Sequence, residues 1–444
     1  MNDFINTTIG DLGKTITGKT PSSSCASDFG DDVMFITPSD NFDNKFISNT
    51  YRKLSLDGVS KLVTKKLPSK SILVSCIGSA MGKVTMNKTV AITNQQINSI
   101  VPKSAFDPDY IYYKLKNSYK LLRNSAMGST ALPMLNKTEF DKLLLSIHTS
   151  RATQKKIASV LSAFDNKIEL NSKINAELEV MAKTLYDYWF VQFDFPNADG
   201  KPYKSSGGEM VYDDVLKREI PKGWDVKKLN TLTSFLSRGI SPRYADGNKG
   251  IPVLNQKCIR GHGLKYQFQR RHDNVSKSAS NRLIEKYDVL VNSTGVGTLG
   301  RVALVRWLIE NEVTVDSHVT IVRAIPEKIN KVFFGYSLLT KQNEIEGFAN
   351  GSTGQVELSR SQLSDISLLI PLANFQNKFE EFYNPIIEAV SINEKQNQEL
   401  VALRDWLLPM LMNGQVTVKD AYESVEGKLG MVAERKEEYN KILK

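Results

Sequence analysis

The stretch Asp288–Leu304, DVLVNSTGVGTLGRVAL, decides how the whole chain is interpreted. A hydrophobic, strand-like run leads into Gly295, Gly297 and Gly300, which spell G-x-G-x-x-G, and an acidic residue, Asp316, follows. In dinucleotide-binding enzymes this arrangement lets the N-terminus of a helix approach a pyrophosphate. Taken alone, the stretch therefore predicts a nicotinamide or flavin site.

An earlier stretch argues against a cofactor site. Ser71–Val84, SILVSCIGSAMGKV, has the same hydrophobic run, small-residue turn and Gly-[Lys/Arg]-Val ending, but it lacks the middle glycine. It also fails as a P-loop, because three residues separate Gly78 from Gly82 where four are needed. After each turn the chain is rich in β-branched residues, whereas a phosphate cradle needs a helix there. The glycine stretch is therefore predicted to be a strand–turn–strand unit that occurs once in each half of the chain.

The similarity between the two halves extends well beyond this turn. Tyr113 matches Tyr336 at an offset of 223 residues, and AMGST at Ala126–Thr130 matches ANGST at Ala349–Thr353 at the same offset. In each copy a helix precedes the small-residue turn and a strand follows it. The first of these helices opens at Asp107, an N-cap residue followed by proline. Two copies with so long a period indicate tandem duplication of a whole domain rather than a solenoid.

A long helical segment follows each copy, at residues 154–191 and 376–412. Apolar residues recur on both with heptad spacing, which predicts two long helices that pair as a coiled coil. Asn171 and Asn393 occupy matching positions, and a buried asparagine at a seam costs stability but fixes register and orientation. The alternative is two amphipathic helices packed on separate domains. The predicted seam residues are Ile157, Val160, Phe164, Ile168, Asn171, Ile174, Leu178, Met181, Leu185 and Tyr188, and Phe379, Phe382, Ile386, Ala389, Asn393, Gln396, Leu400, Leu403, Leu407 and Met410.

The composition is that of an ordinary globular chain with an excess of positive charge. Its 444 residues fit two or three domains, and the formal net charge of +10 favours an anionic partner, nucleic acid first. No apolar run approaches the roughly 18 residues of a membrane span, and the N-terminus lacks an apolar signal region. The three cysteines lie far apart and the four histidines show no ligand spacing. These features favour reduced thiols and a cytoplasmic protein without a metal site.

No catalytic motif stands out. The chain contains no G-x-S-x-G, H-E-x-x-H or C-x-x-C sequence. NPII at Asn384–Ile387 is similar to the N-P-P-aromatic motif of amino-methyltransferases, but it lacks the second proline and the aromatic residue and lies within the second helical segment. Residues 193–224 are rich in Gly, Pro, Ser and Asp, which predicts a surface connection, and residues 416–444 are predicted to form a short charged helical tail.

Over nearly its whole length, the chain resembles the specificity subunits of type I restriction–modification systems. The most specific segments are LEVMAKTLYDYWFVQFDFP (Leu178–Pro196), GKPYKSSGGEMV (Gly200–Val211) and REIPKGWDVKKL (Arg218–Leu229). The segments similar to the openings of the family's target recognition domains are GKTPSSS (Gly18–Ser24), RGISPRY (Arg238–Tyr244) and LNQKCIRGHG (Leu254–Gly263). The glycine turn resembles the family's D-[IV]-L-…-G-x-x-G-[KR]-V segment.

The resemblance implies an α/β (mixed α+β) architecture. Two tandem-duplicated target recognition domains are expected, separated by two long antiparallel coiled-coil helices. The expected boundaries are residues 1–150 for the first recognition domain, 151–192 for the first helix, 193–372 for a linker and the second recognition domain, 373–413 for the second helix and 414–444 for the tail.

The resemblance also implies a non-catalytic subunit that recognises DNA for a larger enzyme. Each recognition domain would read one half of a bipartite site in double-stranded DNA. The helices would set the spacer and dock two modification (methyltransferase) subunits, through which restriction subunits associate. No cofactor is expected on this chain, since S-adenosylmethionine belongs to the modification subunit and ATP and Mg to the restriction subunit. The alternative is a coiled-coil adaptor whose duplicated domains bind protein, and salt-dependent, sequence-selective DNA binding distinguishes the two.

The candidate DNA contacts are hydrogen-bonding and cationic side chains on loops. Base readout needs donors and acceptors that reach a groove, and phosphate contacts need Lys, Arg, Ser, Thr or backbone amides. For each candidate a plain loop or capping role is the alternative, and no catalytic or metal-binding residue is predicted. The candidates are Lys19, Thr20, Ser22, Ser79, Lys83, Ser129, Thr130, Arg238, Ser241, Arg243, Asn255, Gln256, Lys257, Arg260, Arg270, Arg271, Thr298, Arg301, Ser352 and Thr353.

Overall fold

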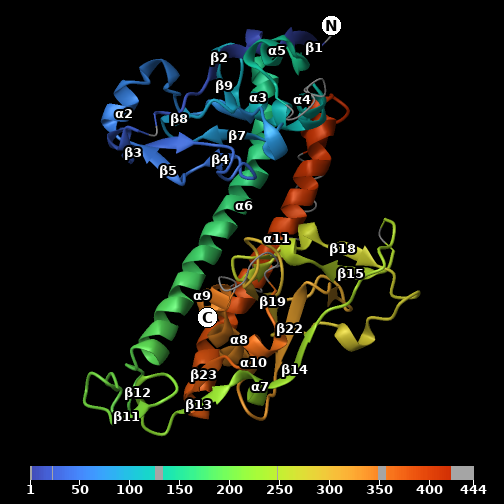
Figure 1. The fold of residues 1–444 in the computed structure, drawn as a ribbon. Helices are drawn as coiled ribbons and strands as arrows, with labels where there is room; N and C mark the ends of the chain where they lie inside the picture. Colours follow the sequence, from blue (N-terminus) through green and yellow to red (C-terminus); the bar gives the residue numbers. More distant parts are fainter. Residues whose placement is uncertain (1–2, 23, 126–133, 248, 349–356, 422–444) are drawn as a thin grey trace. The chain divides into compact units, whose positions relative to one another are not determined.

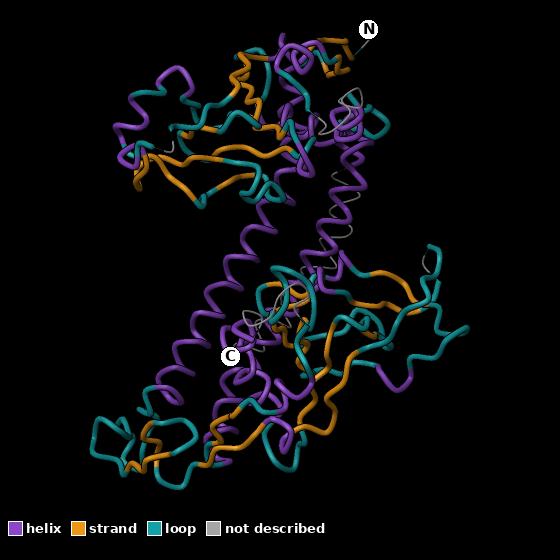
Figure 2. Tube along the Cα trace, viewed as in Figure 1, coloured by secondary structure: helices purple, strands orange, loops and turns teal. Residues whose placement is uncertain are grey.

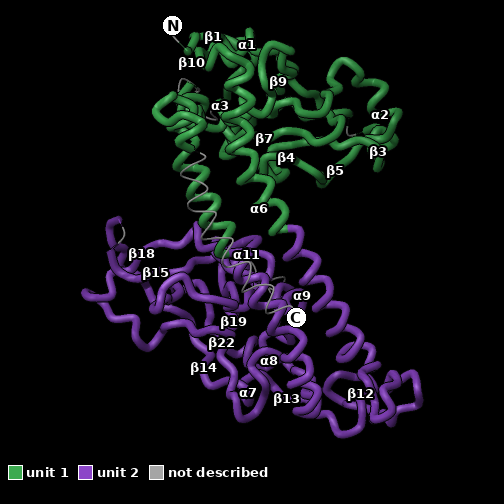
Figure 3. The backbone as a smooth tube through the Cα atoms, turned by 180° about the vertical axis from the view of Figure 1, so that it is seen from behind, with its two compact units in different colours: residues 1–172, 395–441 green, residues 173–394, 442–444 purple. Residues whose placement is uncertain are grey.

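The computed structural model describes residues 3–22, 24–125, 134–247, 249–348 and 357–421. The chain divides into two compact units, residues 1–172 with 395–441 and residues 173–394 with 442–444 (Figure 3). Two long helices, α6 (Arg151–Tyr186) and α11 (Ala373–Met412), each contribute to both units. Each unit therefore consists of one mixed α/β domain and a part of each long helix (Figure 1).

The domain of unit 1 is built from short strands and helices. The strands are β1 (Phe4–Thr8), β2 (Gly13–Thr17), β3 (Phe29–Ile36), β4 (Phe46–Ile47), β5 (Arg52–Leu54), β6 (Ile72–Ser75), β7 (Val84–Asn87), β8 (Ala91–Thr93), β9 (Ile97–Pro102) and β10 (Leu144–His148). The helices are α1 (Ile9–Leu12), α2 (Leu56–Ser60), α3 (Pro108–Asn117), α4 (Tyr119–Asn124) and α5 (Lys137–Lys142). A five-stranded sheet in the order β2-β9-β6-β7-β4 and a three-stranded sheet in the order β5-β3-β8 form its framework.

The domain of unit 2 has strands and helices alternating in a similar way (Figure 2). The strands are β11 (Met210–Asp213), β12 (Arg218–Pro221), β13 (Asp225–Lys228), β14 (Thr233–Arg238), β15 (Ile251–Leu254), β16 (Ile259–Arg260), β17 (Gly263–Leu264), β18 (Arg270–His272), β19 (Val289–Asn292), β20 (Val302–Leu304), β21 (Thr314–Val315), β22 (Val319–Ala324) and β23 (Ser367–Ile370). The helices are α7 (Leu229–Leu232), α8 (Lys331–Thr340), α9 (Gln342–Gly347) and α10 (Arg360–Ser364). A four-stranded sheet in the order β14-β22-β19-β20 and a three-stranded sheet in the order β18-β15-β21 form its framework.

The two domains share one topology, which confirms the predicted tandem duplication. The order β2-β9-β6-β7 in unit 1 corresponds to β14-β22-β19-β20 in unit 2. In the small sheets, β3 pairs antiparallel with β5 and parallel with β8, and β15 pairs antiparallel with β18 and parallel with β21. The predicted fold class, two mixed domains with two long helices, is therefore confirmed.

The glycine stretch forms a β-hairpin turn, as predicted from its similarity to Ser71–Val84. β19 pairs antiparallel with β20, and Gly300 at φ +85° donates its N–H to Asn292 O at 2.8 Å. Gly82 at φ +83° makes the same bond to Ser75 O at 2.8 Å between β6 and β7. Only glycine adopts these φ values without strain. A strand follows each turn, so no helix N-terminus faces the glycines and the dinucleotide hypothesis is wrong.

The helices α6 and α11 pair antiparallel, and buried amides mark their seam. In unit 1, Asn171 Nδ2 donates to Asn397 Oδ1 at 2.9 Å and to Gln396 Oε1 at 2.7 Å. In unit 2, Asn393 Nδ2 donates to Asn175 Oδ1 at 2.7 Å. Asn171 and Asn393 are 0% and 7% exposed, so the predicted asparagines do lie at a buried seam. Residue numbers fall along one helix as they rise along the other, which makes the pair antiparallel.

Near the end of α6 the predicted seam is wrong. Met181 and Tyr188 are 53% and 38% exposed, whereas Ala182, Tyr186 and Phe190 are buried. Tyr186 stacks on Phe333 of α8 with ring centroids 6.1 Å apart. Here α6 packs against the domain of unit 2 as well as against α11, so its buried face is not the one that heptad spacing selects.

The segment at residues 193–224 is not only a surface connection, which corrects the prediction. It contains the β11–β12 hairpin, and three of its aromatic residues, Phe193, Phe195 and Trp224, are buried. Phe195 stacks on Trp224 with ring centroids 4.9 Å apart and contacts Phe375 of α11 at 4.3 Å between centroids. The Gly, Pro and Ser residues around these rings concealed their contribution to the core. Of the predicted tail, only the residues up to 421 are described.

A buried glutamine in the first turn of α6 attaches the helix to the domain of unit 1. Gln154 Nε2 donates to His148 O, at the end of β10, at 2.7 Å. Its Oε1 accepts from the N–H of Asp107, the N-cap residue of α3, at 3.0 Å. One side chain therefore connects the last strand and the main helix of the domain to α6.

Unit 2 repeats this arrangement with Gln376 of α11. Its Nε2 donates to Pro371 O at 2.7 Å, and its Oε1 accepts from the N–H of Asn330, the N-cap residue of α8, at 2.9 Å. Both glutamines are buried, so each amide group depends on partners within the protein for its hydrogen bonds. The two halves thus use the same polar connection between domain and helix.

We expect Gln154→Ala and Gln376→Ala each to lower the free energy of unfolding by about 2–4 kcal/mol, because each removes a buried amide and leaves a backbone N–H and a backbone C=O without their partner. Urea unfolding of the full-length chain measures the loss. Gln192→Ala is the matched control, because Gln192 is exposed and its replacement should change stability by less than about 0.5 kcal/mol. Losses no larger than that of the control would show that the buried glutamines do not connect domain and helix.

Candidate nucleic-acid interface

The loops after β2 and β14 are held in the same way in the two domains. A Cβ on Gly18 would come within 2.2 Å of Thr93 O, and one on Gly239 within 2.0 Å of Val315 O, so both positions require glycine. The next residue in each loop, Lys19 or Ile240, donates its N–H to the same carbonyl at 2.9 Å. The candidates Lys19, Thr20 and Ser22 therefore lie at the same place in unit 1 as Ser241 and Arg243 in unit 2.

These two loops present cations to solvent. Lys19 and Arg243 are exposed, and neither forms an ion pair with any residue that the structure describes. Thr20 Oγ1 donates to Gln95 Oε1 at 2.6 Å, and the hydroxyl groups of Ser22 and Ser24 are 2.7 Å apart. The loops thus combine free positive charge with exposed hydroxyl groups, which is the chemistry of phosphate and base contacts.

Arg238, at the end of β14, is less available than the sequence suggested. It forms an ion pair with Glu357, and its Nη2 donates to Leu358 O at 3.1 Å. Thr320, Ser359 and Arg360 join Arg238 and Glu357 around a cavity of about 400 Å³. The guanidinium is therefore already bound to a carboxylate at the mouth of this cavity.

The loop after β15 uses its amides for its own structure. Asn255 accepts from Lys257 N at 2.8 Å and donates to Phe268 O at 2.8 Å, and Gln256 Nε2 donates to Thr294 O at 2.9 Å. Lys257 and Arg260 are exposed. The cations of this loop are accessible, whereas its amides are bound to the protein.

In the glycine turn of unit 2, two polar side chains bind backbone carbonyls of the turn itself. Arg301 Nη2 donates to Gly297 O at 2.9 Å, and Thr298 Oγ1 donates to Thr294 O at 3.3 Å. In unit 1, Lys83 pairs with Asp43 at 2.8 Å at an exposed site, where such a pair contributes little, and Ser79 is exposed. In unit 2 the turn lies beside the loop after β15, since Gln256 binds Thr294 there.

On β18, the two neighbouring arginines differ in their partners. Arg271 forms an ion pair with Glu310, whereas the guanidinium of Arg270 lies 3.8 Å from the ring centroid of Tyr244. The remaining candidates, Ser129, Thr130, Ser352 and Thr353, lie outside the described residues.

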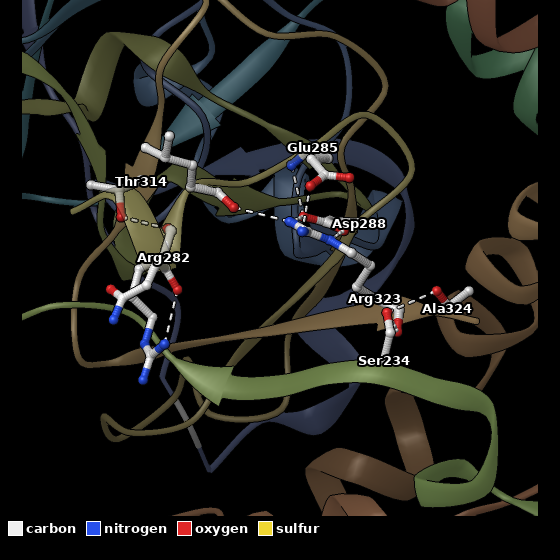
Figure 4. A network of polar contacts seen from close by, with 9 residues as sticks. Ser234, Arg282, Glu285, Asp288, Thr314, Arg323 and Ala324 are labelled. Carbon is white, nitrogen blue, oxygen red and sulfur yellow. Dashed lines mark hydrogen bonds and ion pairs between the residues drawn. The ribbon is translucent and has the colours of Figure 1, made fainter. Parts of the chain in front are cut away.

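Arg323 on β22 is not available to a ligand, because its guanidinium is bound to two carboxylates of the same domain (Figure 4). Its Nε and Nη2 donate to the Asp288 carboxylate at 2.8 and 2.7 Å, and its Nη1 pairs with Glu285. Asp288 is 1% exposed, and burial raises the pKa of its carboxyl group although the Arg323 bonds oppose that shift. Arg323 therefore braces the central sheet of unit 2.

The described residues contain no group of three or more His, Cys, Asp and Glu side chains placed to hold a metal ion. Within the same residues, no helix is long and apolar enough to cross a membrane. Two features of the domains were missed by the sequence analysis: the paired glutamines, and an arginine of unit 1, Arg52, which lies over Phe29 at 4.1 Å from the ring centroid. The glutamines have the same separation along the chain as Asn171 and Asn393, so their positions could have been noticed.

Comparison with known proteins agrees with this architecture. The family model of the type I restriction modification DNA specificity domain matches residues 1–180 and 221–402. The MjaIX type I restriction enzyme specificity subunit of Methanocaldococcus jannaschii is 30% identical over 429 residues, which cover 93% of each chain. The HindI specificity subunit of Haemophilus influenzae is 38% identical over 167 residues, 36% of each chain.

A solved structure shows the same fold. The S subunit of a type I restriction–modification system from M. genitalium superimposes with a TM-score of 0.52 at 16% identity, covering 92% of this chain and 96% of that one. With one match to the family model in each half and a full-length relative at 30% identity, the chain belongs to the family of type I restriction–modification DNA specificity subunits.

Proposed function

We propose that each domain of this specificity subunit reads one half of a bipartite site in double-stranded DNA. The observation that carries the proposal is that the two domains share one topology but differ in the side chains on equivalent loops. The loop after β2 presents Lys19, Thr20 and Ser22 where the loop after β14 presents Ser241 and Arg243. Equivalent scaffolds with different loop side chains suit the recognition of two different half-sites.

The charge of the chain supports DNA as the ligand. The formal net charge is +10, and exposed cations without described ion-pair partners, Lys19, Arg243 and Lys257 among them, lie on the loops. Cations in this state are available to neutralise phosphates, which makes binding dependent on salt. A coiled-coil adaptor that binds protein through these domains is not favoured by any specific observation.

We further propose that the helical pair sets the spacer between the half-sites and docks two modification subunits, through which restriction subunits associate. In support, α6 carries exposed apolar side chains, Leu170, Val180 and Met181 among them. Surface of this kind is typical of protein interfaces. S-adenosylmethionine would then belong to the modification subunit, and ATP and Mg to the restriction subunit, in the cytoplasm.

We expect the purified chain alone to show no methyltransferase or nuclease activity and to bind no S-adenosylmethionine, because its role is to position other subunits. Isothermal titration calorimetry with S-adenosylmethionine checks this, with the complex of the chain and its modification subunits as the positive control. Saturable binding to the isolated chain would contradict the proposal.

We expect replacement of residues 1–150 by the equivalent domain of another family member to change only one half of the methylated sequence. The junction at residue 150 keeps Gln154, whose bonds need only backbone groups of the incoming domain. Single-molecule sequencing of methylated genomic DNA reads both half-sites. The reciprocal exchange of residues 225–372 is the control and should change the other half, and a simultaneous change of both halves would contradict modular recognition.

A further inference from the structure

Each domain carries an exposed arginine stacked on an aromatic ring at the edge of its three-stranded sheet. In unit 1, the Arg52 guanidinium on β5 lies 4.1 Å from the ring centroid of Phe29. In unit 2, the Arg270 guanidinium on β18 lies 3.8 Å from that of Tyr244. Both arginines are exposed.

The strand register shows that the two arginines are equivalent. Arg52 lies opposite Phe35 of β3, and Arg270 lies opposite Val253 of β15, the strand that corresponds to β3. Phe35 and Val253 in turn are the partners of the parallel strands β8 and β21.

The aromatic partners are equivalent as well. Phe29 pairs with Leu54, two residues after Arg52, and Tyr244 forms a bridge to His272, two residues after Arg270. The sequence distance from ring to arginine differs between the domains, so a comparison at constant offset aligns the two arginines but not their rings. The strand register shows that the rings are equivalent as well.

Among the described residues, the two arginines have no carboxylate partner, unlike Arg271 and Arg238. Arg271 is paired with Glu310 and Arg238 with Glu357. A cavity of about 400 Å³ opens beside Arg52, and its lining includes two cations, Arg52 and Lys53, against one carboxylate, Asp31. The residues that line this cavity therefore carry one more positive than negative charge.

Stacking prepares the guanidinium for an anionic ligand. The ring occupies one face of the planar group and restricts its rotamers, while the N–H groups at its edge stay free. Those N–H groups match the geometry of two phosphate oxygens. An exposed stack contributes little to stability, so the retention of this pair in both domains, with Phe in one and Tyr in the other, needs a reason other than folding.

The duplication also decides which part of DNA is contacted. Under the proposed function, on which this inference rests, the two domains read different half-sites. A contact common to both must address what the half-sites share, which is the phosphate backbone and not the bases. We propose that Arg52 and Arg270 are equivalent phosphate contacts, one in each domain, and that Phe29 and Tyr244 are the platforms that orient them.

The test uses Arg52→Gln and Arg270→Gln in the full-length chain assembled with its modification subunits, on duplexes that carry the mapped methylation site. Each variant should weaken binding to this site and to unrelated DNA by the same factor. Each should reduce the slope of log K against log salt concentration by about 0.9, the value for one phosphate. The methylated sequence should stay unchanged.

Arg218→Gln is the matched control. Arg218 also stacks on an aromatic ring, 4.4 Å from the centroid of Phe193, but it lies on β12, outside both small sheets. Its replacement removes one charge and one stack and should leave the slope as in the wild type. Tyr244→Leu, which keeps the charge of Arg270 but removes its platform, should weaken binding several-fold without a change in slope.

Two results would overturn the inference: a slope unchanged in both arginine variants, or a change in the recognised bases of one half-site, which would make the arginine a base contact. If the wild-type complex showed no sequence-selective DNA binding, the proposed function itself would be refuted. Failure of the inference and failure of the proposed function are therefore distinguishable.

Discussion

The pairing of α6 with α11 through buried amides is the constraint on which the rest of the structure depends. Asn171 binds Asn397 in unit 1, and Asn393 binds Asn175 in unit 2. A shift of one helix along the other would leave these amides buried without partners, at a cost of about 1–3 kcal/mol for each polar group. Apolar seam residues tolerate several registers, so the amides select one. Each domain is then attached to this pair by its own glutamine, Gln154 or Gln376.

Within each domain, the ion pairs divide the cations into structural and available groups. Arg323 and Arg238 are bound to carboxylates, and the Arg323 bonds oppose the rise in pKa that burial causes in the carboxyl group of Asp288. Lys19, Arg243 and Arg270 have no such partners among the described residues. Net charge suggested a polyanionic ligand, but these pairings decide which of the positive charges a polyanion can reach.

Much of the fold followed from patterns that occur once in each half of the chain. The hairpin glycines Gly82 and Gly300 and the seam residues Asn171 and Asn393 were all recognised in this way, because backbone conformation and buried polar pairing demand particular residue types. The prediction was wrong for Met181 and Tyr188, since heptad spacing assumes that the partner helix is the only surface against which α6 packs. The stacking of Tyr186 on Phe333 of α8 shows a second surface.

By itself, the sequence determined that the chain is a duplicated pair of domains with two long helices and an excess of positive charge, because periodicity, repetition and charge can be read from the order of residues without knowledge of their contacts. Only the tertiary structure decided which polar side chains are used internally. Asn255 and Gln256 look like base-reading groups in the sequence, yet both are bound to backbone carbonyls, and Arg52 lies in a segment without a motif but stacks on Phe29. The availability of a side chain depends on neighbours that are distant in the sequence, and strand register, not residue spacing, brings those neighbours together.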